Sequence, residues 1–319
     1  MTRRFDVAVM HDFFVDRLVH VASVSQIAEA VRRKAAASGG GIHGVPQDES
    51  RGGNAVNLAH ALARLGVRTL LITHSDVMHE PLLRSPFEGL RAEVRVKPLP
   101  AGLTVAFEEN VNVMLGDGRG AADFGPSLLG EEDWEALENS RVVCSVNWAA
   151  NRRGTELLVA LRGRLGEEKP IFLDPADFRD NIQEFAGLLK MIAERRLVDW
   201  VSTNEVEAVA AGRALGLEAR NLGELCRSLA LKLGVVFDLH AARASYTSEG
   251  TRVAEARAGK VRPRRLTGAG DVWDAAAIYG RLAKLDEVGR LRLANRAAKL
   301  YLESKEPVPP TLGELTGRR

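Results

Sequence analysis

The chain has 319 residues, 45% of them apolar, which suffices to bury one large α/β core or two modest ones and excludes a disordered chain. Its 44 basic and 42 acidic residues leave a formal net charge of +2, too small to indicate a nucleic-acid partner. Two cysteines without metal-ligand spacing, no stretch of roughly 20 apolar residues and no signal-peptide pattern predict a soluble cytoplasmic protein without a disulfide framework, a zinc site or a membrane partner.

Short apolar runs alternate with helical patterns through most of the chain. The strand candidates, in chain order, are Asp6–Met10, Thr69–Thr73, Val142–Val146, Pro170–Asp174, Trp200–Ser202 and Val235–Leu239. The clearest helix candidates, with apolar residues three and four positions apart, are Ala55–Leu65, Thr155–Leu165, Glu205–Leu215, Asn221–Leu233, Asp271–Leu285 and Glu287–Glu303. This alternation is typical of an α/β protein with a mostly parallel sheet covered by helices on both faces.

Two regions break the alternation. The extended runs Thr104–Glu108 and Val111–Leu115 follow each other through Glu109-Asn110 with no helix between them, which predicts an antiparallel ribbon standing off the main sheet. After a helical segment at Val24–Ala37, the glycines of residues 38–46 permit backbone shapes that other residues resist, so we expect a mobile loop there. The tail from Lys305, with three prolines, is expected to cap the domain.

The segment Thr267-Gly268-Ala269-Gly270-Asp271 leads into a helical pattern and predicts an anion site. Small residues leave backbone N–H groups accessible, and a helix N-terminus carries a partial positive charge. Taken alone, the glycines favour an ordinary capped helix whose first-turn acid is a dipole partner or an N-cap. Phosphoryl transfer needs donors for the migrating charge and a carboxylate near the attacking hydroxyl, and this one loop could supply both.

Two motifs carry a family resemblance. Gly268-Ala269-Gly270-Asp271 with Trp273 resembles the C-terminal signature of ribokinase-like (PfkB-type) carbohydrate kinases, and residues 51–66, beginning Arg51-Gly52-Gly53-Asn54, resemble the family's other signature. The resemblance extends over essentially the whole chain. It implies a single kinase domain over residues 1–319, a three-layer α/β/α sandwich with a small β-stranded lid contributed roughly by residues 11–22, 38–52 and 94–121.

The resemblance also implies an activity, the transfer of the terminal phosphoryl group of a nucleotide to a hydroxyl of a sugar, sugar derivative or nucleoside. Asp271 would be the general base, with Gly268, Ala269 and Gly270 forming the anion hole. An acceptor-only carboxylate suits a polyol, because each hydroxyl can donate to it. The molecule that receives the phosphoryl group is called the acceptor below. The residues predicted to bind it are Asp16, the weaker candidate Asp12, Gly52, Gly53, Asn54, Asn57 and Asn147, with Asp174 at a second strand end.

On the nucleotide side, Asn204 and Glu207 resemble the family's Asn-x-x-Glu motif, which organises Mg²⁺ through water, a ligand set that suits this cation. A plain helix N-terminus is the alternative interpretation of this pair. Asn295 matches a position that lines the adenine pocket in relatives. The remaining candidates for contact with the nucleotide are Thr267, His240 and Arg243.

The sequence departs from the family pattern at two places. Arg265 and Leu266 stand where the family carries Asp and Thr that help to hold a monovalent cation, which leaves potassium activation open. After Leu239, the residues His240-Ala241-Ala242-Arg243-Ala244 lack both glycines that the family places around the nucleotide. ATP is the expected donor, and the missing glycines leave ADP as an alternative.

Other functions remain to be weighed. A ligand-binding or regulatory protein that kept the fold but lost turnover is the alternative motivated by the missing glycines. A Rossmann-type dehydrogenase fits the sequence poorly, because Gly39-Gly40-Gly41 precedes no suitable helix and no Gly-x-Gly-x-x-Gly follows the first strand. Exposed edges of the lid strands make a homodimer a further expectation.

Overall fold

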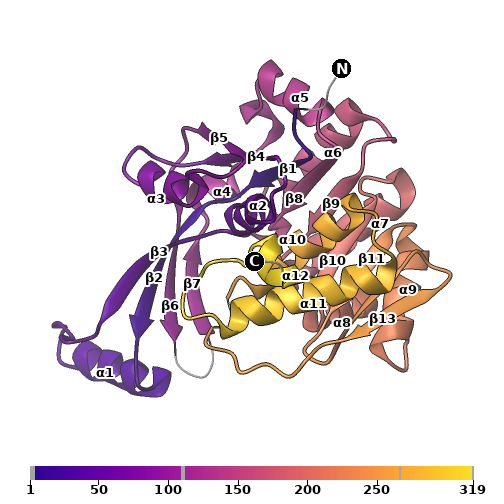
Figure 1. Ribbon diagram of the computed structural model, residues 1–319. Coiled ribbons are helices and arrows are strands. Elements are labelled where there is room, and N and C mark those ends of the chain that lie inside the picture. Colours follow the sequence, from indigo (N-terminus) through magenta and orange to yellow (C-terminus); the bar gives the residue numbers. More distant parts are fainter. Residues whose placement is uncertain (1–3, 109–111, 266, 318–319) are drawn as a thin grey trace.

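The computed structural model describes residues 4–108, 112–265 and 267–317, and its centre is a nine-stranded sheet in the order β13-β12-β11-β10-β9-β8-β1-β4-β5 (Figure 1). The strands from β5 to β11 are parallel, whereas β12 and β13 are added antiparallel at one edge. Their bounds are β1 (Val7–His11), β4 (Thr69–His74), β5 (Ala92–Lys97), β8 (Val142–Val146), β9 (Ile171–Asp174), β10 (Trp200–Asn204), β11 (Val236–His240), β12 (Ala244–Ser248) and β13 (Val253–Arg257).

Helices cover both faces of this sheet. One face is covered by α5 (Glu131–Glu138), α6 (Gly154–Leu165), α7 (Ile182–Arg195), α8 (Glu205–Ala214) and α9 (Leu222–Leu233). The other face is covered by α2 (Asn54–Arg64), α3 (Glu80–Arg84), α10 (Ala269–Leu282), α11 (Glu287–Glu303) and α12 (Leu312–Thr316). Shorter helical turns are α4 (Arg119–Ala122), η1 (Ser85–Phe87), η2 (Pro126–Leu128), η3 (Trp148–Ala150) and η4 (Arg179–Asn181).

The side chains of β1 show how the sequence creates two cores. Val7 and Val9 pack into the core beneath α2 and α10, while Ala8 and Met10 pack into the core beneath α5 to α9, because successive side chains of a strand point to opposite faces. All five residues of β1 are buried. The predicted three-layer α/β/α sandwich with a mostly parallel sheet is therefore confirmed.

A separate four-stranded sheet stands off the main body in the order β3-β2-β6-β7 (Figure 1). We call it the lid sheet; its strands are β2 (Phe14–His20), β3 (Gln47–Gly52), β6 (Gly102–Glu108) and β7 (Asn112–Asp117). The predicted ribbon corresponds to the antiparallel pair of β6 and β7, and its connection through Glu109-Asn110 lies outside the described residues. Residues 94–97, which the sequence assigned to the lid, instead pair with β4 in the main sheet.

The helix α1 (Val24–Ala36) lies at the far end of the lid sheet (Figure 1), and none of its residues is buried. Residues 39–46, which connect α1 to β3, have no regular secondary structure. Within the described residues, no helix combines the length and the apolar character that spanning a bilayer would require.

Candidate active site

Two helix N-termini, those of α2 and α10, meet at the carboxyl ends of the central strands. Gly53 precedes α2 with φ of +100°, and a Cβ at this position would lie 2.7 Å from the backbone oxygen of Asp12. Gly268 precedes α10 with φ of +83°, and a Cβ there would lie 2.8 Å from the hydroxyl of Tyr301. Both positions therefore need glycine for backbone conformation and for space. These glycines set the entry of each helix into the site.

Asp271 lies in the first turn of α10 and is held by two amides from α2. Asn54 Nδ2 donates to Asp271 Oδ1 over 3.0 Å, and Asn57 Nδ2 donates to Asp271 Oδ2 over 2.9 Å. The carboxylate is only 5% exposed. The structure thus brings together the two sequence motifs, which are more than 200 positions apart, around one carboxylate.

Asp12 stabilises the N-terminus of α2. It follows β1 and is fully buried, and its oxygens accept hydrogen bonds from the backbone N–H groups of Asn54 (2.9 Å) and Ala55 (2.8 Å) and from Asn147 Nδ2 (2.7 Å). Asn147 adopts a left-handed conformation directly after β8. Asp12 and Asn147 were predicted to contact the acceptor; in the structure Asp12 binds the N-terminus of α2, and Asn147 donates to Asp12.

Carboxylates gather around Asp271 and change one another's protonation. Burial, followed by the charges of Asp174 and Asp12, raises the pKa of Asp271 well above its usual range, and its two amide partners oppose this shift. Burial also raises the pKa of Asp174, the last residue of β9, to about 6. Asp274, one turn further along α10, accepts a hydrogen bond of 2.6 Å from Ser202 Oγ, and burial raises its pKa as well. Ionisation of Asp271 is consequently favoured when positive charge lies nearby.

A pocket of about 390 Å³ opens on one side of the α10 N-terminus, and we call it the nucleotide pocket. Its polar lining includes Asn204, Glu207, His240 and Asn295, and Ala269 and Gly270 also line it. The apolar part of the wall is formed by Val206, Ala241, Ala242, Ala258, Val261, Trp273, Ala298 and Leu302.

Arg243 was also predicted to contact the nucleotide. It is exposed and is not among the described residues that line this pocket.

His240 and Asn295 both contact Trp273, the aromatic residue of the C-terminal motif. The ring centroids of His240 and Trp273 lie 5.0 Å apart, and burial lowers the pKa of His240 to about 4, so the imidazole is neutral at pH 7. Asn295 Oδ1 accepts a hydrogen bond of 2.8 Å from Trp273 Nε1, and Asn295 Nδ2 donates to the backbone oxygen of Ala256 over 3.1 Å. Asn295 therefore fixes the indole in place at the pocket wall.

Asn204 and Glu207 form a reciprocal cap at the start of α8. Asn204 Oδ1 accepts from the N–H groups of Val206 and Glu207 at 2.9 and 3.0 Å, and Glu207 accepts from the backbone N–H (2.9 Å) and the amide (2.6 Å) of Asn204. Burial, together with the charges of Asp174 and Asp177, raises the pKa of Glu207 to about 8. A divalent cation would relieve this repulsion, so the oxygen-rich donor set fits Mg²⁺ bound through water.

A second pocket, of about 380 Å³, opens on the other side of the α10 N-terminus, and we call it the acceptor pocket. Its residues come from the lid sheet, from α2, from the segment before α10, and from the end of α11 and the residues that follow it. They are Asp16, Leu18, Asp48, Ser50, Arg51, Asn57, Met114, Arg264, Arg265, Thr267, Tyr301, Lys305 and Pro307. Thr267, predicted on the nucleotide side, lies here instead. Gly52 faces Asp16 so closely that any side chain at position 52 would collide with the Asp16 carboxylate.

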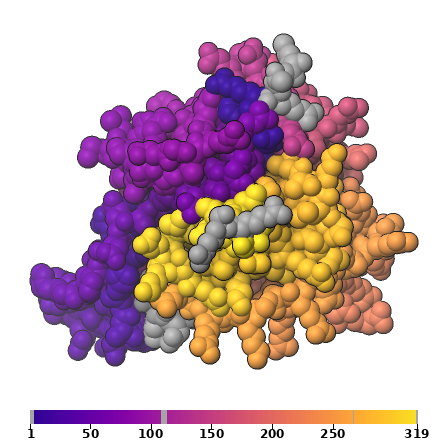
Figure 2. Space-filling model, in the orientation of Figure 1, coloured from indigo at the N-terminus to yellow at the C-terminus, as the bar shows by residue number. Residues whose placement is uncertain are grey.

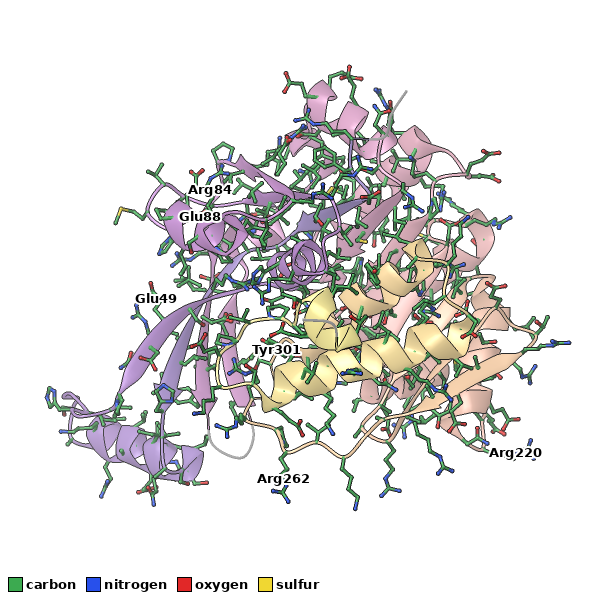
Figure 3. The ribbon with its side chains drawn as sticks, in the orientation of Figure 1. Glu49, Arg84, Glu88, Arg220, Arg262 and Tyr301 are labelled. Carbon is green, nitrogen blue, oxygen red and sulfur yellow. The ribbon has the colours of Figure 1, made fainter. Side chains whose placement is uncertain are left out.

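Several residues of this second pocket were not predicted from the sequence. Tyr301 lies near the end of α11 closest to the lid strands (Figure 3), and Arg264 precedes the C-terminal motif. The basic run Arg262-Pro263-Arg264-Arg265 was the available signal for the arginines. Nothing in the helical pattern of α11 distinguishes Tyr301 from an ordinary core residue.

The whole chain was also compared with known proteins. No protein-family model and no curated protein matches the sequence. Solved structures match over nearly its full length, among them a probable sugar kinase from Rhizobium etli (TM-score 0.79, 18% identity, 99% of this chain and 98% of that one) and an adenosine kinase from Sinorhizobium meliloti (0.78, 19%, 98% of both). A ribokinase from Arabidopsis thaliana, complexed with ribose and ATP, matches with a TM-score of 0.76 and 17% identity over 98% of both chains.

Proposed function

Given that the chain has the ribokinase-like fold, we propose that it is a kinase that transfers the terminal phosphoryl group of ATP to a hydroxyl of a sugar, a sugar derivative or a nucleoside. One observation carries the proposal. The Asp271 carboxylate lies in the first turn of α10, whose residues Ala269 and Gly270 line the nucleotide pocket. Each of its oxygens is held by an amide of α2, one of them from Asn57, which lines the acceptor pocket.

The chemical step follows from this position. The acceptor hydroxyl lies beside Asp271 and its oxygen attacks the terminal phosphorus of ATP, while Asp271 takes the hydroxyl proton. A new P–O bond forms to the acceptor, the P–O bond to the β-phosphate breaks, and ADP leaves with the electron pair of that bond. The amides of Asn54 and Asn57 orient the base, because each hydrogen bond fixes one carboxylate oxygen.

The backbone at the start of α10 stabilises the charge that moves. The first N–H groups of a helix have no partner within the helix, and those of Ala269 and Gly270 belong to residues that line the nucleotide pocket. The positive end of the helix dipole adds to this effect. Gly268 adopts the left-handed conformation at the N-cap, so that α10 begins with the N–H groups of Ala269 and Gly270.

The nucleotide pocket suits the donor. Its apolar wall next to Trp273 can receive a base, and Asn204 and Glu207 lie in the same pocket as Ala269 and Gly270. Mg²⁺ held through water by Asn204 and Glu207 would neutralise phosphate charge. ATP is the proposed donor, a choice supported by the structural neighbour that was solved with ribose and ATP.

Replacement of the base tests the proposal. In Asp271→Asn the side chain keeps its size but cannot take a proton, so we expect kcat for ADP release to fall by about 10²- to 10⁴-fold while ATP still binds. Glu224→Gln is the matched control, since Glu224 is also a first-turn acid but lies in α9. Wild-type kcat in Asp271→Asn would overturn the assignment. No turnover by the wild-type protein with any acceptor, despite measurable ligand binding, would instead identify a ligand-binding protein.

A further inference from the structure

The acceptor pocket is rich in positive charge. Four basic side chains, Arg51, Arg264, Arg265 and Lys305, line it, against two acidic ones, Asp16 and Asp48. Asp48 is already paired with His20 over 2.8 Å. Within the described residues, none of the four basic side chains has a carboxylate within ion-pair distance, whereas most other arginines of the chain have one.

Arg51 is the most enclosed of the four and has only neutral hydrogen-bond partners. Its Nη1 donates to Asn57 Oδ1 over 3.1 Å, and its Nη2 lies 2.6 Å from His60 Nδ1. Burial and the neighbouring Arg51 charge lower the pKa of His60 to about 3, so this imidazole is neutral and accepts the hydrogen bond. Burial also lowers the pKa of Arg51 itself, although the charges of Tyr301, Asp271 and Asp16 oppose this shift.

The hydrogen bonding of the Arg265 guanidinium is also incomplete. Its Nη2 donates to the backbone oxygen of Ser304 over 3.0 Å, and its guanidinium lies 5.5 Å from the ring centre of Tyr301. Its Nε is buried without a hydrogen-bond partner. A buried donor without an acceptor is costly, and an anion in the pocket would supply the missing acceptor.

The basic cluster faces the acceptor and not the nucleotide. It shares its pocket with Asp16, Asn57 and Thr267, and Asn57 bonds directly to Asp271. The nucleotide pocket has its own cations, Lys299 and Arg179, and the latter is paired with Asp177 at 2.5 Å. The basic side chains of the acceptor pocket are therefore separate from the cations that line the nucleotide pocket.

We infer that the acceptor carries an anionic group of its own, a phosphate or a carboxylate on a polyol, which the cluster of Arg51, Arg264, Arg265 and Lys305 binds while Asp16 accepts hydrogen bonds from its hydroxyls. This inference rests on the proposed kinase function. A guanidinium presents a planar fork of donors that matches either oxyanion, and two or more such groups discriminate strongly against a neutral ligand. The reaction would thus add a second anionic group to a molecule that already has one.

Paired acceptors test the inference. With ATP and Mg²⁺, ADP release is measured for hexose phosphates and aldonic acids, each beside its neutral parent sugar, and for nucleosides beside their monophosphates. We expect kcat/KM for anionic acceptors to exceed that for the neutral partners by 100-fold or more. The phosphate and carboxylate arms show which of the two oxyanions the pocket prefers.

Variants assign the effect to the cluster. Arg264 and Lys305 are exposed, and their side chains have no hydrogen bond or ion pair to the described residues, so Arg264→Gln and Lys305→Gln should fold normally. Together they should raise KM for the anionic acceptor by about 10- to 100-fold and leave KM for ATP unchanged. Arg262→Gln is the matched control, because Arg262 belongs to the same basic run but projects from the lower edge of the molecule, outside the pocket lining (Figure 3).

The outcomes separate the inference from the kinase proposal. Turnover of neutral acceptors as well as anionic ones, or a rise in KM for ATP in place of the acceptor, overturns the inference and leaves the kinase standing. Binding of an anionic acceptor by calorimetry, weakened in Arg264→Gln but with no turnover, supports the inference and overturns the kinase. Neither binding nor turnover of any anionic acceptor overturns the inference, and it overturns the kinase as well when no neutral acceptor is turned over.

Discussion

Asp16 links the acceptor pocket to pH. Burial raises its pKa to about 6; the charge of Asp12 adds to the shift, while a hydrogen bond from Thr104 and the charge of Arg51 oppose it. Asp16 can bind acceptor hydroxyls as a full charge only when it is ionised. We therefore expect kcat/KM to fall as the pH is lowered through about 6, as measured with a saturating level of ATP.

The same residue should lower the stability of the empty protein. Its folded pKa exceeds the unfolded value of 3.8, so the folded state holds the proton more tightly and the free energy of unfolding falls as pH rises from about 4 to about 6. Asp16→Asn removes this pH-dependent loss of stability. Urea unfolding at pH 7 should show Asp16→Asn to be more stable than the wild type by about 1–3 kcal/mol, although acceptor turnover is lost.

Asp48→Asn is the control, since Asp48 belongs to the same sheet but is exposed and paired with His20. A less stable Asp16→Asn at pH 7 would contradict the assignment of Asp16 as a carboxylate destabilised by burial.

Individual site residues were predictable only where a motif named them. The sequence predicted roles for Asp271, Asn54 and Asn57, but their mutual hydrogen bonds depend on how α2 and α10 meet, which no local pattern encodes. Asp12 shows the limit most clearly. A carboxylate at a strand end suits a ligand and a helix N-terminus equally well, and only the fold shows that it binds the N–H groups of α2.

At the scale of elements, the α11 helix is joined to the sheet by a buried ion pair. Arg290 is fully buried, and its Nη1 and Nη2 donate to Asp238 Oδ2 (2.5 Å) and Oδ1 (2.9 Å) in β11. Nη2 also donates to Thr247 Oγ1 in β12 over 2.8 Å. Removal of one partner of such a pair leaves the other charge uncompensated in the interior.

We expect Arg290→Met to lower the free energy of unfolding by about 3–5 kcal/mol, as measured by urea denaturation. The double variant Arg290→Met/Asp238→Leu should regain part of this loss, because it removes both charges. Arg220→Ala is the control, since Arg220 pairs with Glu224 on the exposed surface of α9 (Figure 3) and its loss should leave the midpoint unchanged. An unchanged midpoint in Arg290→Met would show that the ion pair does not contribute.

Most elements of the main sheet were predictable, because buried parallel strands appear as short apolar runs. Those runs correspond to β1, β4, β8, β9, β10 and β11. The strand β3, with the sequence QDESRG, has no apolar residue and was missed, since it is stabilised by pairing with β2 and not by burial. The helix α7 was also missed, although Phe185, Leu188, Leu189 and Ile192 follow a helical spacing; its N-cap residue Asn181 makes no side-chain cap hydrogen bond.

At the scale of the whole molecule, the lid sheet exposes an apolar surface. In β7, Met114 lines the acceptor pocket, so its neighbours Val113 and Leu115 point to the opposite face, where they are 41% and 62% exposed. β7 is also an edge strand of the lid sheet. An exposed apolar face on an edge strand favours pairing with a second chain.

We therefore predict a homodimer formed through the outer face of β7. Sedimentation velocity should give twice the mass of one chain, and Leu115→Glu should give the monomer. Leu231→Glu is the matched control, because Leu231 is 63% exposed but lies on α9, in the main body. A monomeric wild-type protein, or a Leu115→Glu variant that remains dimeric, would contradict the prediction.

The hydrogen bonds between α2 and Asp271 also have a consequence for biosynthesis. Figure 2 shows the early, indigo and purple part of the chain lying against the yellow helices that are translated last. Asn54 leaves the ribosome long before Asp271, so a nascent chain cannot form these hydrogen bonds. On the proposed kinase function, truncated translation products that end before α10 are unable to consume ATP through this site.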